Sequence, residues 1–394
     1  MTLDEVVKKT LNNNPELQLY ATRLLGVAGL QESANLAPAL ELAVEIENVA
    51  GSGNFSGVDQ AETTVALSSF IELGNKKRAR VAVTNAKHTQ LKMQQQLEAL
   101  ALLAEVTRRY ITVLAAQERL AIADESSQIA ENTLRSIEQR SQAGASMRTD
   151  VLRAQAENVK ALRKREAIAT ELTIAKSQLA LLWGQTAIDF DGVTGDLFDV
   201  GDLVDLDDFQ SVILNNPIVE VYATELGVRQ AQLELSRSQS SPDIQWQLGA
   251  RQFQETSDTA LVLGLNIPLF SGKRSSGNVK AAQADLLEVQ QRRDIALLEL
   301  QSTLFSLTQQ QQQAIAQANE LRDTVIPLLE ESVVEAADAY DRGRYRYTDW
   351  INAQRDLVDA QENLIASAKQ ALTLRASIEQ YTAAPLSDLT ENNE

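Results

Sequence analysis

Two aspartates that follow glycine-containing turns are the first candidates for chemistry in this sequence. In GASMRTDVLRAQ, Gly144 precedes Asp150, and in GRYRYTDWINAQ, Gly343 precedes Asp349. Glycine can adopt a positive φ and so allow two helices to reverse direction. An aspartate in the first turn of the returning helix complements the helix dipole. Helix capping is therefore the simplest explanation of both aspartates, before any further role is considered.

Other residue types that carry chemistry are scarce. The chain has no cysteine, one histidine (His88) and three methionines. Transition-metal sites need histidine, cysteine or clustered carboxylates in fixed geometry, so we expect neither a metal site nor a cofactor within one chain. The sequence contains no nucleotide-binding loop, nucleophile elbow or His–Glu zinc motif. These observations favour a protein that is not an enzyme.

Composition restricts the partners of the protein. The 394 residues are 44% hydrophobic and 23% charged, which is typical of a folded chain. The net charge is −18, so we do not expect nucleic acid or an anionic membrane to bind through a broad basic surface. No apolar run reaches the length of about 18 residues that predicts a transmembrane helix. No signal peptide precedes LDEVVKKTL, so we expect any export signal to have been removed.

The chain contains two copies of one plan. LNNNP at Leu11–Pro15 recurs as LNNP at Leu214–Pro217, and the two turn segments quoted above share Gly, Thr, Asp, Ala and Gln in register. The basic pair Lys77-Arg78 likewise corresponds to Lys273-Arg274. Such a period, kept from end to end, indicates duplication. We predict structural repeats over 1–200 and 201–394 that form one intertwined domain.

Long stretches almost free of glycine and proline predict four long helices. They cover about 75–141, 148–183, 275–342 and 347–382. Pro327 interrupts the third and should kink it or mark a junction. The apolar spacing forms a coiled-coil-like seam with further apolar residues beside it, so each helix can pack on two sides. A cylinder of helices fits this pattern, and on the helices alone a soluble coiled-coil scaffold is the alternative.

Alternating segments predict two strands in each repeat, over about 38–49, 62–73, 243–252 and 258–270. In LVLGLNIPLF, Leu261–Phe270, the leucines share one face of the strand. Strands of about ten residues with one apolar face are typical of an outer-membrane barrel, and a soluble sheet with one buried face is the alternative. Four strands are too few for a barrel, and open edges are unfavourable in hydrocarbon. Several chains must then share one barrel.

Four glutamates lie on the polar faces of the first two predicted strands. They are Glu41, Glu45, Glu47 and Glu72. If the leucines face lipid, these carboxylates line the water-filled lumen and raise the local concentration of cations. The alternative is a solubilising lining without selectivity.

Together these features resemble the TolC-type outer-membrane efflux factors. The resemblance is carried by the two repeats, by LNNNP and LNNP, by NIPLFSGKR after the fourth strand, and by G-x4-TD-x3-AQ at both turns. The segment DTVIPLLEESVVEAADAYDRGRY is most similar to the heavy-metal branch, the CzcC/CusC type. The resemblance implies a mainly α-helical fold with a β-barrel portion. In it, a homotrimer closes a 12-stranded transmembrane barrel above a long periplasmic helical barrel.

The same resemblance implies a function and partners. The protein would be a passive exit channel in the bacterial outer membrane, in contact with its lipid and extending into the periplasm. It would dock onto a periplasmic adaptor and an inner-membrane resistance-nodulation-division (RND) pump, and would export divalent cations such as cobalt, zinc and cadmium. One alternative keeps the fold but exports drugs or, in type I secretion, protein. The other alternative is the soluble scaffold without a pore.

The turns then acquire expected roles. In the family the second turn lies at the periplasmic constriction, where the residue matching Asp349 forms an acidic ring. The position three residues further on is often acidic and is Asn352 here. We expect Arg344, Tyr345 and Arg346 to hold neighbouring helices closed, with Asp150 as the first-repeat counterpart of Asp349. Gly144, Ala145, Ser146 and Gly343 are the predicted tip that contacts the adaptor.

Overall fold

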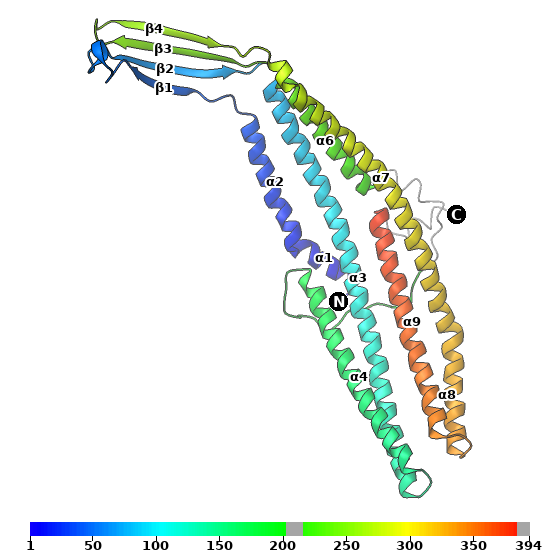
Figure 1. Ribbon diagram of the computed structural model, residues 1–394. Helices are drawn as coiled ribbons and strands as arrows, with labels where there is room; N and C mark the ends of the chain where they lie inside the picture. The colour runs from blue at the N-terminus through cyan, green and yellow to red at the C-terminus, as the bar shows by residue number, and fades with distance from the viewer. Residues whose placement is uncertain (202–215, 384–394) are drawn as a thin grey trace. The chain divides into compact units, whose positions relative to one another are not determined.

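The computed structural model describes residues 1–201 and 216–383, so the first residues of the LNNP motif lie outside the described ranges (Figure 1). The described chain is mainly helical with one small antiparallel sheet, as predicted. Its principal elements are, in chain order, α1 (Leu3–Asn13), α2 (Pro15–Ala34), β1 (Glu41–Glu47), β2 (Glu62–Ile71), α3 (Lys76–Gln142), α4 (Arg148–Leu181), α6 (Pro217–Ser238), β3 (Ile244–Phe253), β4 (Thr259–Asn266), α7 (Ser271–Glu320), a π-helical turn (Leu321–Val325), α8 (Ile326–Asp341) and α9 (Tyr347–Thr382).

Two compact units share these elements, and each unit draws on both repeats. Unit 1 consists of Met1–Leu19, Gln96–Ile218 and Leu297–Glu394, and unit 2 of Tyr20–Gln95 and Val219–Ala296. The sheet therefore belongs to unit 2, and both helix-to-helix turns belong to unit 1. Among the described helices, none is long and apolar enough to cross a membrane.

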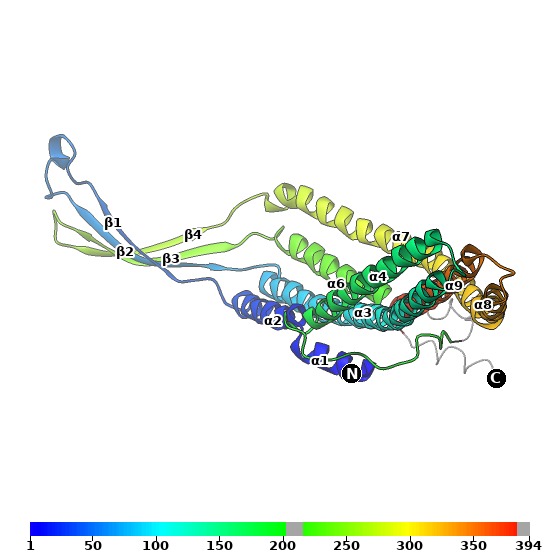
Figure 2. The same cartoon turned by 90° about the horizontal axis from the view of Figure 1, so that it is seen from below.

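The sheet of unit 2 has the strand order β1-β2-β3-β4, with every neighbouring pair antiparallel (Figures 1 and 2). Its register brings Leu42, Leu67, Leu248 and Leu263 into one row across the four strands. Residues of one row share a face because antiparallel partners point the same way. The next row along the strands places Glu41, Ser68, Gln247 and Gly264 on the opposite face. The predicted division into an apolar and a polar face thus extends over the whole sheet.

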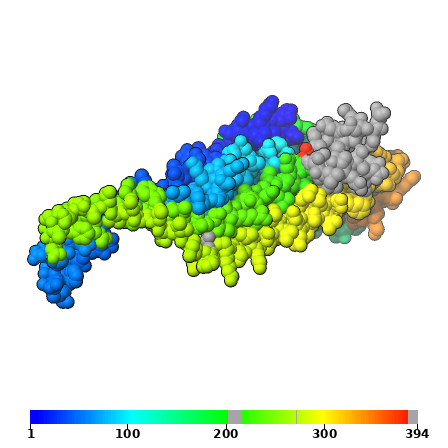
Figure 3. Space-filling model, turned by 90° about the horizontal axis from the view of Figure 1, so that it is seen from above, coloured from blue at the N-terminus to red at the C-terminus, as the bar shows by residue number. Residues whose placement is uncertain are grey.

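The apolar face is not covered by other parts of unit 2. Leu261, Leu263 and Leu265 are 79%, 77% and 75% exposed. Figure 3 shows that no helix lies over the strands on the face that it presents. Unit 2 therefore leaves the leucine row exposed, although such a surface is normally buried in a soluble domain.

Strands β1 and β4 are shorter than the alternation predicted. β1 covers Glu41–Glu47 and β4 covers Thr259–Asn266, against the expected 38–49 and 258–270. Proline lacks the N–H needed for a ladder, so Pro38 and Pro268 limit these strands. Asn48, after β1, also takes a positive φ of 58°, which is incompatible with an extended strand.

Unit 1 has a helical core in which α3, α4 and α9 take part. Val106, Leu179 and Ile365 are almost fully buried in it. The Asn–Pro motifs fix the helices that follow them. Asn14 Oδ1 accepts the backbone N–H groups of Glu16 and Leu17 at 2.9 and 3.0 Å, while its Nδ2 donates to Leu182 O at 2.8 Å.

The second motif repeats this arrangement. Asn216 Oδ1 accepts the N–H of Ile218 at 2.9 Å, and its Nδ2 donates to Tyr381 O. Each asparagine therefore caps one helix and ties it to the end of the long helix of its own repeat. This dual use explains why LNNNP and LNNP recur.

Pro327 lies at a junction, as predicted. The helical chain passes through the π-helical turn Leu321–Val325 and continues as α8, with Pro327 in its first turn. Proline has no N–H and its ring clashes with the carbonyl group four residues earlier, which is that of Asp323. The wider π turn accommodates this clash without ending the helical path.

Candidate functional site

The two glycine turns share one geometry. Gly144 and Gly343 have φ values of +74° and +71°. In the first turn Ala145 N donates to Arg140 O at 2.8 Å, and in the second Arg344 N donates to Ala339 O at 2.8 Å. This six-to-one bond around a left-handed residue is the Schellman motif. No atom lies within 4 Å of a Cβ added at either glycine, so backbone conformation alone requires glycine there.

The aspartates occupy the expected first turns of α4 and α9. Asp349 Oδ2 accepts the backbone N–H of Arg346 at 3.2 Å and lies 3.5 Å from Arg346 Nε. Asp150 Oδ2 accepts a weak hydrogen bond of 3.4 Å from Ser146 Oγ. Both carboxylates thus act on their own helix starts, where the helix dipole favours a negative charge.

The other predicted gate residues are exposed. Tyr345 is 53% exposed, and the side chains of Arg344, Tyr345 and Asn352 have no hydrogen-bond or ion-pair partner within residues 1–201 and 216–383. The Arg346 side chain is 85% exposed and, within the described ranges, forms its ion pair with Asp349. Closure by these residues would therefore require contacts with another chain, and it stays a prediction.

An open groove of about 710 Å³ brings the two turns together. Predicted residues from both turns line it, namely Gly144, Ala145, Ser146, Asp150, Gly343, Tyr345 and Arg346. Arg344, Asp349 and Asn352 are not part of its lining. The residues predicted for the tip are thus neighbours in unit 1, although the two turns are far apart in the sequence.

An aromatic cluster that sequence reasoning missed joins the two helical hairpins. Tyr340 stacks on Trp350 with ring centroids 5.4 Å apart, and Tyr347 meets both rings edge-on. Arg140, at the end of α3, lies over the Tyr340 ring at 4.7 Å and binds Asp341 through Nη1–Oδ1 at 2.9 Å. The available signal was the concentration of four aromatic residues within 340–350 in a chain that is 5% aromatic.

Burial changes the pKa of one residue of this cluster, Tyr347. Desolvation, with a smaller contribution from the negative charge of Glu157, raises the pKa of Tyr347 to about 12. The hydroxyl is therefore uncharged at physiological pH. The cluster acts as an apolar packing element between the turns.

The four predicted lumen glutamates do not form one set. Glu47 pairs with Arg251 at 2.9 Å, and Glu72 forms a two-point ion pair with Arg80 at the start of α3. Glu41 and Glu45 are exposed and have no ion-pair partner in the described part of the chain. Only these two remain as free negative charges on the polar face of the sheet.

The sequence matches the profile of one family along most of its length. That family, described as outer membrane efflux protein, matches residues 6–185 and 209–384. The chain belongs to the outer membrane efflux protein family. It is accordingly an outer-membrane protein, and the sheet with an exposed apolar face and the paired helical hairpins fit this assignment.

Relatives of this efflux protein support the same conclusion. The cobalt-zinc-cadmium resistance protein CzcC of Cupriavidus metallidurans is 28% identical over 91% of this chain and 84% of its own length. The nickel-cobalt-cadmium resistance protein NccC of Alcaligenes xylosoxydans xylosoxydans is 23% identical over 77% and 69%. The solved outer-membrane channel OprN is similar in fold, with a TM-score of 0.80 at 16% identity, over 98% of this chain and 90% of that one. The predicted TolC-like fold and efflux family are thus confirmed.

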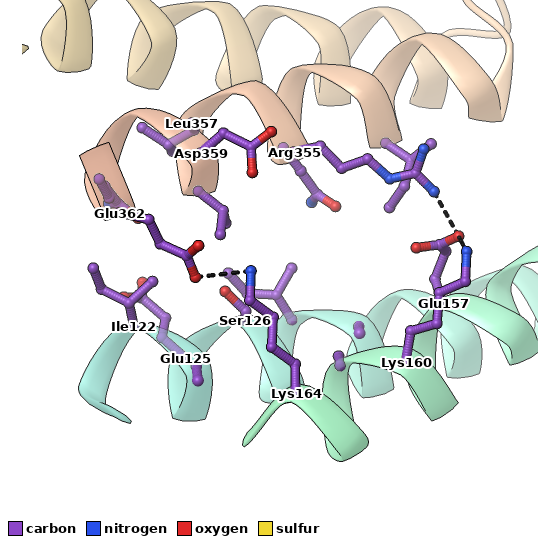
Figure 4. Close-up of a pocket in the computed structure, with 18 of the residues that line it drawn as sticks. Ile122, Glu125, Ser126, Glu157, Lys160, Lys164, Arg355, Leu357, Asp359 and Glu362 are labelled. Atoms are coloured by element: carbon purple, nitrogen blue, oxygen red, sulfur yellow. Dashed lines mark hydrogen bonds and ion pairs between the residues drawn. The ribbon is translucent and has the colours of Figure 1, made fainter. Parts of the chain in front are cut away.

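A second missed feature of the efflux protein is a cavity of about 250 Å³ between α9 and the α3–α4 hairpin (Figure 4). Two ion pairs cross it, Arg355 Nη2–Glu157 Oε1 at 2.5 Å and Lys164 Nζ–Glu362 Oε1 at 2.7 Å. Burial alone would raise the pKa of Glu157, but hydrogen bonds from Arg355 and Lys160 outweigh it and lower the pKa. Glu157 therefore stays charged and holds the two hairpins together.

Side chains that could hold a metal ion do not cluster in the part of the chain that the structure describes. In the described ranges, no group of three or more His, Cys, Asp or Glu residues is placed to hold one.

Proposed function

We propose that this efflux protein is the homotrimeric exit channel of a tripartite RND efflux system for divalent heavy-metal cations. The observation that carries the proposal is the sheet, whose exposed leucine face suits lipid. The outer edges of β1 and β4 pair with no further strand among the residues that the structure describes. Each backbone N–H or C=O group that lacks a hydrogen-bond partner in hydrocarbon costs several kcal/mol. Three copies, joined edge to edge, would close a barrel and remove these edges.

The similarity to CzcC and NccC supports the cargo. Both relatives are named for resistance to cobalt and cadmium. Free carboxylates at Glu41 and Glu45 on the polar face would attract cations without binding them tightly, which suits a duct. The protein would then be passive, with energy supplied by the pump rather than by any enzymatic step.

The two turns support the remaining parts of the proposal. The groove lined by Gly144, Ala145, Ser146 and Gly343 provides an exposed tip for a periplasmic adaptor. Three copies of Asp349 around a narrow opening would repel one another and attract cations, so the repulsion would favour opening of the channel. Asn352 in place of an acid would leave a single ring.

Metal sensitivity of a deletion strain tests this function. We expect loss of the gene to lower tolerance to cobalt, zinc or cadmium, with recovery on complementation, while tolerance to hydrophobic drugs stays the same. Tolerance to nickel should be measured as well, because NccC is also named for nickel. A strain that loses only drug tolerance or protein secretion would show that the channel serves another cargo.

A further inference from the structure

Four exposed cations surround the points where the sheet of unit 2 gives way to helices. We call Lys77, Arg78, Lys273 and Arg274 the basic collar. They lie in the first turns of α3 and α7, in corresponding positions of the two repeats. All four side chains are exposed, and none has an ion-pair partner among the residues that the structure describes. The proposed channel function does not use them.

Helix stability does not explain these residues. Cations at a helix N-terminus oppose the helix dipole, which favours acids there by about 0.3–1 kcal/mol each. Yet α3 and α7 have no acidic residue in their first turns. The collar thus works against the local electrostatics of both helices.

Internal ion pairs do not explain the collar either. The acids of this junction are already neutralised by other cations of α3, since Asp243 binds Lys76 Nζ at 2.6 Å and Glu72 binds Arg80. In the sequence, the next acid after Glu72 is Glu98, and the first acid after Lys273 is Asp285. The junction therefore carries a local positive excess in a chain of net charge −18.

The collar adjoins the apolar surface of the sheet. Leu269 and Phe270, between β4 and the collar residues of α7, are 72% and 83% exposed. Leu73 is also exposed between β2 and α3. An apolar band that ends in exposed lysine and arginine is the order of groups found where a membrane protein passes from acyl chains to headgroups.

We propose that the basic collar binds the phosphate groups of anionic phospholipids in the leaflet that borders the helical end of the sheet. The proposal rests on the proposed placement of the sheet in the bilayer. The negative net charge of the chain argues against a broad basic surface. Salt, however, screens each charge–charge interaction beyond about 10 Å. The local excess of positive charge at the collar therefore determines lipid binding there. The repetition of the pair in both repeats would place six such pairs around a trimer.

Lipid titration followed by native mass spectrometry tests the collar. Detergent-solubilised wild type is compared with Lys77→Gln/Arg78→Gln, and with the variant that also carries Lys273→Gln/Arg274→Gln. The matched control is Lys87→Gln/Lys92→Gln, which removes two exposed cations further along α3. At 1.5 Å per residue they lie about 14 and about 21 Å beyond Arg78. Phosphatidylglycerol is the anionic probe and phosphatidylcholine the neutral one.

We expect wild type and control to bind phosphatidylglycerol more tightly than phosphatidylcholine. The fourfold variant should lose about tenfold or more of this preference, and the double variant part of it, since each cation near an anionic surface contributes substantially. Equal binding of both lipids by wild type, or an equal loss in the control, would overturn the proposal. Insertion into phosphatidylcholine liposomes is measured in parallel, because failure of wild type to insert would count against the channel function itself.

Discussion

At the scale of single residues, both glycine turns need a residue with a positive φ. The sequence predicts glycine turns at Gly144 and Gly343, because a residue without a Cβ adopts a positive φ at little cost. The structure adds that space is not the constraint, since a Cβ at either position would meet nothing within 4 Å. Within the fold of one chain, their role is therefore to supply the left-handed backbone conformation.

Substitution of Gly343 should measure this conformational requirement. Gly343→Ala forces an L-residue into the left-handed region and should lower the stability of unit 1 by about 1–2 kcal/mol. Gly26→Ala is the control, because Gly26 lies inside helix α2 with nothing near its Cβ position and should stabilise by about 0.5–1 kcal/mol. Thermal unfolding followed by circular dichroism gives both shifts. Destabilisation of equal size at both sites would argue against the turn as the cause.

Asp349 is the residue on which the proposed gate depends. Asp349→Ala would remove the repulsion within the acidic ring of a trimer, so we expect lower resting conductance in a planar bilayer and weaker block by divalent cations. Asp356→Ala is the matched control, since Asp356 is exposed on the same helix and has no ion-pair partner in the ranges described. If Asp349→Ala leaves conductance and block unchanged, the gate is elsewhere.

At the scale of elements, sequence periodicity predicts the faces of a single helix or strand. It does not predict the side-chain contacts between two elements. The strand faces and the long helices follow from repeats of two and of about 3.6 residues within a single stretch. The contact of Arg140 with Asp341 joins residues 201 positions apart, and no local pattern encodes it. The ion pair of Glu72 could not be predicted for the same reason, because its partner Arg80 belongs to the following helix.

The ion pairs across the α9 cavity should make the hairpin contact sensitive to acid. Because the pKa of Glu157 is lowered in the folded protein, its contribution is complete above the ordinary carboxyl pKa of about 4.3 and is lost as the pH falls through the lower folded value. We expect Glu157→Gln to lower stability by about 1 kcal/mol at pH 7. The difference from wild type should shrink as the pH falls below about 4.3, and vanish only below the lowered folded pKa, where both side chains are uncharged.

Two further variants make this expectation specific. Glu166→Gln on the same helix breaks only the exposed pair with Arg163 and should change little. The exchange Glu157→Arg/Arg355→Glu should restore part of the loss if the attraction between the hairpins is its cause. A loss that persists undiminished at pH 3 would point to packing rather than charge.

At the scale of the whole molecule, two open sheet edges and one exposed apolar face make the single chain incomplete. The sequence predicted this, since four strands cannot close a barrel and the leucine row has no partner face. The residues alone did not predict how many chains form the oligomer, because four strands per chain set only a minimum number of chains for a closed barrel. The expectation of a trimer came from the family resemblance.

The two faces of β4 allow a direct test of which side meets lipid. Leu263 lies in the apolar row with Leu248, and its neighbour Val262 lies in the opposite row with Gly249. An arginine on the lipid side costs about 2–4 kcal/mol near the bilayer midplane, whereas one on the lumen side meets water. We therefore expect Leu263→Arg to reduce the fraction that folds into liposomes. Val262→Arg should insert normally but pass less cation current, because it adds positive charge beside the conducting path. Equal insertion of the two variants would mean that neither face of the sheet meets the bilayer, and a reversed order would place the leucines toward water.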